Sequence, residues 1–267
     1  MKGFQLRTRV LSLRYDLEPD SFDLFQNNDT TIVISDVEKN SFMLSLKAIE
    51  GEVPGEKFFG KAHDVFGHFI MALNIASLGH FTWDFQLVQP VPYILDSFDD
   101  NKSQFLFGNK VEITKEDDIL KFDKNFAWST LQLIMILKKE EDTVVKDEYL
   151  KGIYNTHHKF FNIDFTNEAF VNFYKAFEYF CTNRILGLKK LSNEKKQLRG
   201  VLKDFGFEEE ILEDFDKIYI ARSSKVMHAQ RSIETCDKEL LEKLKIFLDA
   251  LMHKYYKPLW EKVLSNS

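Results

Sequence analysis

The chain has 267 residues, of which 44% are hydrophobic and 29% are charged. This composition is that of a globular protein and excludes a disordered or collagen-like chain. Glycine (11 residues) and proline (5) are scarce, which disfavours a loop-rich all-β sandwich and favours helices, while 26 phenylalanines predict a phenylalanine-rich core. The net charge of −6 does not attract nucleic acid through the field of the whole protein, so any such binding requires a local basic patch.

The two cysteines and the apolar runs bear on the compartment. Cys181 and Cys236 cannot build a disulfide framework, which indicates a reducing environment. Residues 1–20 hold no apolar stretch of the kind that a secretory signal needs, and the longest apolar run, 133–137, is far too short to cross a bilayer. We therefore expect a cytoplasmic protein without a membrane partner.

The N-terminal part mixes the patterns of strands and of a helix. Four segments have the alternation or the β-branched composition of half-buried strands: 11–17, 30–34, 42–48 and 81–87. Between the last two, apolar residues recur at steps of three and four over 58–73, as on one face of an amphipathic helix. Residues 1–110 are predicted to form a small α+β unit.

Residues 96–110 are polar and turn-prone, which marks a boundary, and the strand pattern stops after them. Six later segments have helical periodicity: 116–139, 146–160, 166–191, 193–205, 208–229 and 237–256. Thr166 is expected to cap the third of these helices. The predicted fold class is α+β, with the α+β unit over 1–110 followed by an all-α helical bundle over 111–267.

Several kinds of site are disfavoured by the motifs that the sequence lacks. His63 and His68 flank Asp64, but there is no HExxH motif and no third ligand at a recognisable spacing, so structural or surface histidines are expected. No glycine-rich phosphate loop, GxSxG elbow or kinase signature appears, which argues against nucleotide-binding and α/β-hydrolase folds. No metal or other cofactor is predicted.

The segment 218–231, IYIARSSKVMHAQR, holds the residues best suited to chemistry. A guanidinium such as that of Arg222 can hold a phosphodiester with two parallel hydrogen bonds and offset the charge of its transition state. An imidazole such as that of His228 can move the proton of a 2′-hydroxyl or of a leaving 5′-oxygen. Arginine, serine, lysine and histidine on one helix are also typical of an ordinary solvated face.

The spacing of these two residues matters for any joint action. On one straight helix, six residues place Arg222 and His228 about 120° apart and ~9 Å along the axis. A site built from both would need a bend, the length of the arginine, or a second copy of the helix from a partner subunit.

Three stretches resemble the HEPN superfamily, and within it the Apea-like HEPN group: AFVNFYKAFEYF (169–180), RILGLKKL (184–191) and YIARSSKVMHAQ (219–230). The hallmark of that group is an arginine, a polar residue, a short spacer and a histidine late in a helical bundle. The resemblance covers residues 164–256. It implies a domain that dimerises so that two Arg/His motifs meet, often as a metal-independent endoribonuclease in antiviral defence, toxin or RNA-processing settings.

Carried over to this chain, the resemblance makes Arg222 the phosphate-binding arginine, Ser223 the polar residue after it and His228 the catalytic histidine, with Glu178 as an orienting carboxylate. Cleavage by 2′-hydroxyl attack would leave a 2′,3′-cyclic phosphate. Two features depart from the family pattern. The spacer has five residues where four are common, and Ala229 stands where a glycine often follows the histidine.

A basic stretch in the same region suggests where RNA would bind. Residues 184–203 contain seven positive residues and a single negative one, Glu194. Such a run is usually a solvated face, but beside Arg222 and His228 it would steer phosphates to the site. The predicted RNA contacts are Arg184, Lys195, Lys196, Arg199 and Lys225.

Two rivals to the nuclease hypothesis stay open. One is a catalytically inactive HEPN-like module that binds RNA or assembles with a partner. The other is a nucleotide-binding or nucleotidyl-transfer partner module, which lacks a visible phosphate loop. RNA and a second copy of the chain are the expected partners, and the sequence identifies no protein partner or antitoxin.

Overall fold

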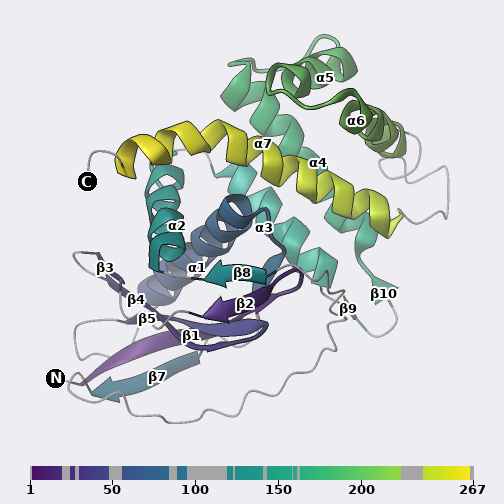
Figure 1. Ribbon diagram of the computed structural model, residues 1–267. Coiled ribbons are helices and arrows are strands. Elements are labelled where there is room, and N and C mark those ends of the chain that lie inside the picture. Colours follow the sequence, from purple (N-terminus) through teal and green to yellow (C-terminus); the bar gives the residue numbers. More distant parts are fainter. Residues whose placement is uncertain are drawn as a thin grey trace. The chain divides into compact units, whose positions relative to one another are not determined.

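The computed structural model describes residues 2–19, 25–27, 30–47, 56–83, 89–94, 119–122, 124–140, 143–157, 159–160, 163–223 and 237–264 (Figure 1). The chain divides into two compact units, Met1–Leu137 and Lys138–Ser267. The first combines a sheet with helices, and the described part of the second is helical apart from one two-residue strand pair. The predicted α+β class with a helical C-terminal part is confirmed.

An antiparallel sheet organises the first unit. Its strands are β1 (Lys2–Ser12), β3 (Phe25–Asn27), β4 (Thr30–Glu38), β5 (Ser41–Lys47), β6 (Phe81–Trp83) and β7 (Gln89–Ile94). They are arranged in the order β3-β4-β5-β1-β6, and β7 also pairs with β1. Opposite residues of β1 and β5 are both apolar at Leu6 and Leu46 and again at Val10 and Phe42, so their side chains reach the core together. A separate parallel pair joins β2 (Asp16–Pro19) to β8 (Ile119–Phe122).

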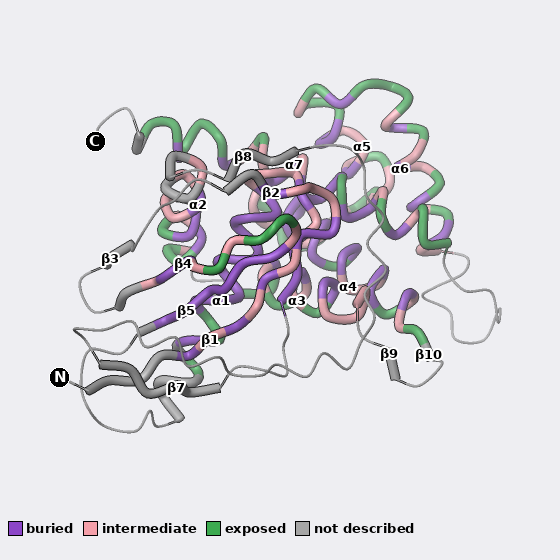
Figure 2. The backbone as a smooth tube through the Cα atoms, turned by 60° about the horizontal axis from the view of Figure 1, so that its bottom comes forward, coloured by how far each residue is buried: buried purple, intermediate pink, exposed green. Residues whose placement is uncertain are grey.

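Helix α1 (Glu56–Ser77) forms the core of this unit with the sheet. Its residues 65–75 are all buried, as the tube in Figure 2 shows. Phe69 meets Phe42 of β5 edge to face, with ring centroids 6.3 Å apart. A helix that is apolar on nearly all sides needs cover on more than one face. Helix α2 (Lys124–Leu137) packs against it and supplies part of that cover.

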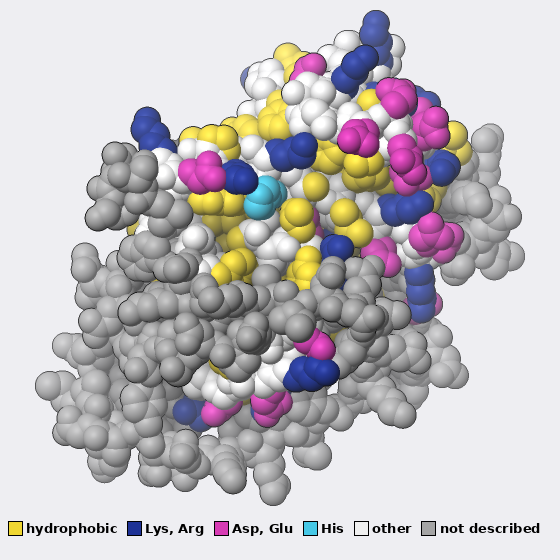
Figure 3. Space-filling view, in the orientation of Figure 1, with side chains coloured by type: hydrophobic (Ala, Val, Ile, Leu, Met, Phe, Trp, Pro, Cys, Tyr) yellow, Lys and Arg dark blue, Asp and Glu magenta, His cyan; other side chains and the backbone are white. Residues whose placement is uncertain are grey.

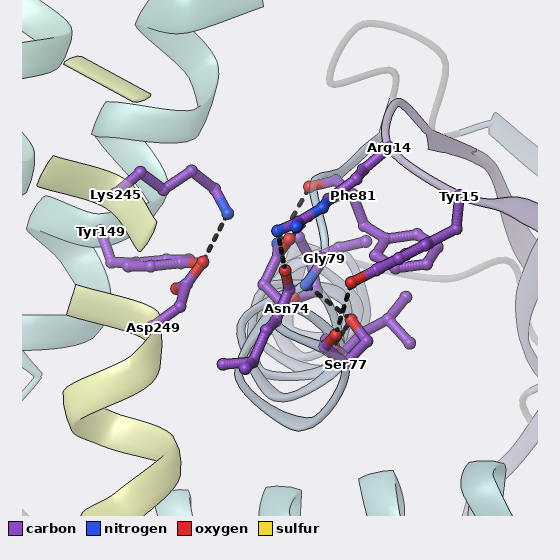
Figure 4. A network of polar contacts seen from close by, with 12 residues as sticks. Arg14, Tyr15, Asn74, Ser77, Gly79, Phe81, Tyr149, Lys245 and Asp249 are labelled. Atoms are coloured by element: carbon purple, nitrogen blue, oxygen red, sulfur yellow. Dashed lines mark hydrogen bonds and ion pairs between the residues drawn. The ribbon is translucent and has the colours of Figure 1, made fainter. Parts of the chain in front are cut away.

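The end of α1 is joined to β6 by a buried asparagine (Figure 4). The Asn74 amide donates to the carbonyl groups of Ile70 and Phe81, each at 3.0 Å, and accepts from the Phe81 N–H at 2.7 Å. Arg14 donates to the Leu78 carbonyl at 3.0 Å, where the backbone has turned to a positive φ of 51°. These bonds satisfy groups that a helix end would otherwise leave unpaired.

The second unit consists of helices around a phenylalanine-rich core, as the composition predicts. They are α3 (Val144–His157), α4 (Thr166–Tyr179), a π-helical extension η1 (Phe180–Ile185), α5 (Glu194–Asp204), α6 (Glu209–Ala221) and α7 (Lys238–Leu264), with the strand pair β9 (Lys159–Phe160) and β10 (Ile163–Asp164) between α3 and α4. Phe170, Phe173 and Phe177 of α4 are fully or almost fully buried. Gly152 lets α3 approach α4 closely, because a Cβ there would lie 2.6 Å from the Phe173 ring.

The observed boundaries differ from the predicted ones in several helices, among them α7, which continues to Leu264 where the prediction ended at 256. Residues 119–122 and 159–160, predicted as helix, are strands, because each finds a partner strand that local periodicity does not reveal. The helix that begins at Thr166 ends at Ile185 rather than 191, since Gly187 adopts a φ of 63°. Its N-cap position is held by Phe165, so the expected capping role of Thr166 is wrong.

The boundary between the two units also lies later in the chain than the composition suggests. The change at 96–110 falls outside the described residues, and the contacts divide the chain after Leu137. The reason is that β8 pairs with β2 and α2 packs against α1, so both belong to the first unit. The predicted helical bundle from 111 therefore includes elements that complete the N-terminal unit.

A buried ion pair within α7 of the second unit is joined by a tyrosine of α3 (Figure 4). Lys245 and Asp249 are 2.6 Å apart with side chains only 3% and 2% exposed, and the Tyr149 hydroxyl donates to the same carboxylate at 2.7 Å. Burial, and to a smaller extent the charge of Lys245, lower the pKa of His157 to about 4. The lowered pKa favours the neutral imidazole at pH 7.

Asp249→Ala is expected to lower the free energy of unfolding by about 3–5 kcal/mol, because it removes the carboxylate that faces a buried ammonium group. Lys257 and Glu261 provide the matched control, since they have the same spacing on the same helix but are 52% and 57% exposed. Glu261→Ala should cost about 0–1 kcal/mol. Urea unfolding of both variants makes the comparison, and equal losses would contradict the assigned role of burial.

Candidate functional site

Arg222 occupies the C-cap position of α6, and its backbone is still helical, with φ −55° and ψ −47°. Its N–H remains bonded to the carbonyl groups of Ile218 and Tyr219. The side chain is 22% exposed. Arg222 is thus fixed at its backbone, while its guanidinium lies where the bundle meets solvent.

Two carboxylates from two other helices face this guanidinium. Nη1 lies 3.2 Å from Oε2 of Glu194, the first residue of α5, and Nη2 lies 3.8 Å from Oε2 of Glu178 on α4. The arginine therefore links α4, α5 and α6. Within the described cluster, one positive charge meets two negative charges.

Two tyrosine rings complete the surroundings of the arginine. The guanidinium carbon lies 5.2 Å from the ring centre of Tyr174 and 5.9 Å from that of Tyr219. The Tyr174 hydroxyl donates to Oε1 of Glu194 at 2.8 Å. Burial and this hydrogen bond raise the pKa of Tyr174, so it remains a donor. Tyr174 consequently fixes both the guanidinium and one of its carboxylates.

The other carboxylate is held less firmly. No described residue donates a hydrogen bond to the side chain of Glu178, which is 35% exposed against 21% for Glu194. Burial raises the pKa of Glu178, the charge of Glu194 raises it further, and Arg222 opposes both. Arg222 Nε is buried and has no hydrogen-bond acceptor among the described residues. The site thus combines a fixed arginine with a carboxylate that protonates more readily than usual.

Local sequence explains how these groups converge. Tyr174 and Glu178 are four residues apart on α4 and so lie on one face of that helix. Glu194 follows Asn193, whose side chain accepts from the Lys196 N–H at 3.3 Å and so begins α5. This cap fixes the position of Glu194 at the start of its helix.

The structure brings together some predicted site residues and leaves others undescribed. Arg222 and Glu178, chosen from the sequence, do meet, and half-buried Ser223 follows the arginine. His228 and Lys225 lie outside the described residues. Sequence reasoning missed Tyr174 and Glu194. The signal for Glu194 was its place as the single acidic residue in the basic stretch.

The predicted RNA contacts fall into two groups. Arg184, Lys195 and Arg199 all face carboxylates: Arg184 lies 3.2 Å from Glu140, Lys195 lies 3.0 Å from Asp216, and Arg199 lies 2.6 Å from Asp216 and also contacts Glu209. Lys196 is exposed, as are Lys189, Lys190 and Lys203. In Figure 3 basic and acidic side chains are interspersed over α5 and α6. The net charge of the stretch is thus partly offset by its neighbours.

Other candidate groups have ordinary surroundings. In the described part of the chain, no three His, Cys, Asp or Glu side chains gather closely enough to hold a metal ion. His68 Nδ1 lies 2.7 Å from the Asp64 carbonyl oxygen, one turn earlier on α1. Cys181 is a free thiol, and burial raises its pKa. Among the described helices, none combines the length and the apolar character needed to span a membrane.

Comparisons with protein-family models, with curated proteins and with solved structures returned no match to this chain.

Arg199→Ala is expected to lower the free energy of unfolding by about 1–3 kcal/mol, because it removes charged hydrogen bonds between α5 and α6. Lys196→Ala, on the same helix but exposed, should change it by less than about 0.5 kcal/mol. Chemical unfolding of both variants tests this. If the two losses were equal, Arg199 would be a surface charge available to a ligand.

Proposed function

We propose that the helical unit is a HEPN-type, metal-independent RNA endonuclease in which Arg222 binds the scissile phosphate and His228 transfers protons. The observation that carries this proposal is the approach of Glu178 to Arg222 at 3.8 Å across two helices. A phosphate-binding arginine oriented by a carboxylate of an earlier helix is what the family resemblance implies.

The arginine is suited to this task by its surroundings. Ring contacts on Tyr174 and Tyr219 and the ion pair with Glu194 fix the guanidinium, which lowers the entropy lost on binding an anion. Its 22% exposure leaves part of the group open to a phosphate. A planar guanidinium offers two parallel donors, and these can stabilise the charge that develops on phosphate oxygens.

The proposed reaction begins with attack of the 2′-hydroxyl on the adjacent phosphorus and ends with a 2′,3′-cyclic phosphate and a free 5′-hydroxyl. In this proposal the chain forms a homodimer that brings two motifs together, and it acts in the cytoplasm in antiviral defence, as a toxin, or in RNA processing. These settings are those that the resemblance implies.

A second candidate is a catalytically inactive HEPN-like module for RNA binding or partner assembly. The charge balance around Arg222 favours it, because two carboxylates already compensate the guanidinium that would bind phosphate. The internal ion pairs of Arg184, Lys195 and Arg199 point the same way. In this function Arg222 would mainly join helices.

Incubating end-labelled RNA of mixed sequence with the purified protein in EDTA separates the two candidates. We expect cleavage to products with 2′,3′-cyclic phosphate ends, and a loss of about 10²–10⁴-fold in rate for His228→Ala. Arg222→Ala should weaken RNA binding as well as rate, and Arg222→Lys should restore only part, because an ammonium lacks the planar pair of donors.

Lys217→Ala is the control, since Lys217 is an exposed residue of the same helix as Arg222. It should cleave like the wild type. Circular dichroism establishes that each variant is folded. Absence of cleavage by the wild type, or full activity of His228→Ala, would reject the nuclease. Metal-independent RNA binding without cleavage would support the second candidate.

A further inference from the structure

We propose that Glu178 is the general base of the reaction, taking the proton of the attacking 2′-hydroxyl, while Glu194 and Tyr174 position the arginine. This inference rests on the proposed ribonuclease function. It gives Glu178 a catalytic role in addition to the orienting role predicted from the sequence.

The contacts of the two carboxylates separate their roles. Glu194 lies 3.2 Å from Arg222 Nη1, and its other oxygen accepts the Tyr174 hydroxyl proton at 2.8 Å. Both of its oxygens are thereby engaged in holding the site together. Glu178 is 3.8 Å from Nη2 and accepts no hydrogen bond from a described side chain. Glu178 therefore keeps oxygen lone pairs that no described side-chain donor occupies, and these can accept a proton.

Exposure and position suit Glu178 to that task. Its side chain is 35% exposed, whereas those of Glu194 and Arg222 are 21% and 22% exposed. A phosphate oxygen that accepts from Nη2 would lie about 2.8 Å from that nitrogen, on the side of the guanidinium that Glu178 borders. A general base acts over roughly 2.6–3.2 Å, so the inference requires the 2′-hydroxyl next to such a phosphate to lie within that distance of Glu178.

The proton and bond changes balance with the groups named. The Glu178 carboxylate takes the proton from the 2′-hydroxyl as the 2′-oxygen forms its bond to phosphorus. The bond from phosphorus to the 5′-oxygen breaks, and the 5′-oxygen takes a proton from solvent water as it leaves. Glu178 then returns the proton it took to the solvent, so no net proton is gained or lost.

The electrostatic surroundings favour a base that works closer to neutral pH than an ordinary glutamate. Among the described residues, the ionisable groups around Glu178 are Glu194 of α5, Arg222 of α6, Tyr174 of its own helix and the buried Cys181 thiol. Burial and Glu194 raise the pKa of Glu178, and Arg222 limits the rise. A base must be deprotonated to act, so the rate should increase as the pH rises through this elevated pKa.

The experiment measures kcat, RNA affinity and the pH dependence of kcat between about pH 4 and pH 8, in EDTA, with a short random-sequence RNA pool. Glu178→Gln should lower kcat by about 10²–10⁴-fold and remove the acidic limb of the profile, with RNA affinity not reduced. Glu178→Asp should keep part of the rate. Its kcat should still fall at acidic pH, but with a different midpoint. Glu168→Gln, an exposed glutamate of the same helix, is the control and should match the wild type.

The outcomes distinguish this inference from the function on which it rests. If the wild type does not cleave, both are rejected. If the wild type cleaves and Glu178→Gln keeps its rate, the ribonuclease stands and Glu178 is not its base. A slower Glu178→Gln that retains the acidic limb would show a positioning role, which also overturns the inference.

Discussion

The Arg222 guanidinium joins three helices of the C-terminal unit, because Glu178 of α4 and Glu194 of α5 both face it from α6. A charge that is only 22% exposed needs partners, since burial without them costs several kcal/mol. The rings of Tyr174 and Tyr219 cover its faces, and Tyr174 also fixes Glu194. The arrangement of α4, α5 and α6 and the chemistry proposed for the site thus depend on the same few contacts.

Charge is distributed in this unit for both folding and function. The same helix α5 that supplies Glu194 is held against α6 by Arg199 and Lys195, which share Asp216. These cations therefore help to hold Glu194 in place, and a ligand would have to compete with Asp216 for them. A surplus carboxylate beside a fixed arginine is costly for stability alone, and the proposed proton transfer gives it a use.

Much of the fold follows from local pattern. Alternation and helical periodicity predict the sheet strands at 30–34 and 42–48 and the helix that became α1. The strands β8 and β9 were predicted as helix because their pairing depends on segments that periodicity does not connect, such as β2, about a hundred residues before β8.

The site could be predicted only where one segment carried the signal. Arg222 and Glu178 each stand in stretches that resemble the HEPN pattern, so both were found. Glu194 and Tyr174 act through contacts between helices, which a linear sequence does not display. For the same reason a count of positive residues overstated the free charge of the basic stretch, because Asp216 and Glu209, which offset it, lie on the next helix.

The pKa of Glu178, followed by carbon-detected NMR of its carboxyl group, tests the geometry of the site most directly. The account predicts a pKa above the ordinary 4.5, a lower value in Glu194→Gln and a higher value in Arg222→Met, because the first change removes a repulsive charge and the second an attractive one. An ordinary pKa that neither substitution moves would show that the three side chains do not meet, and would contradict the account.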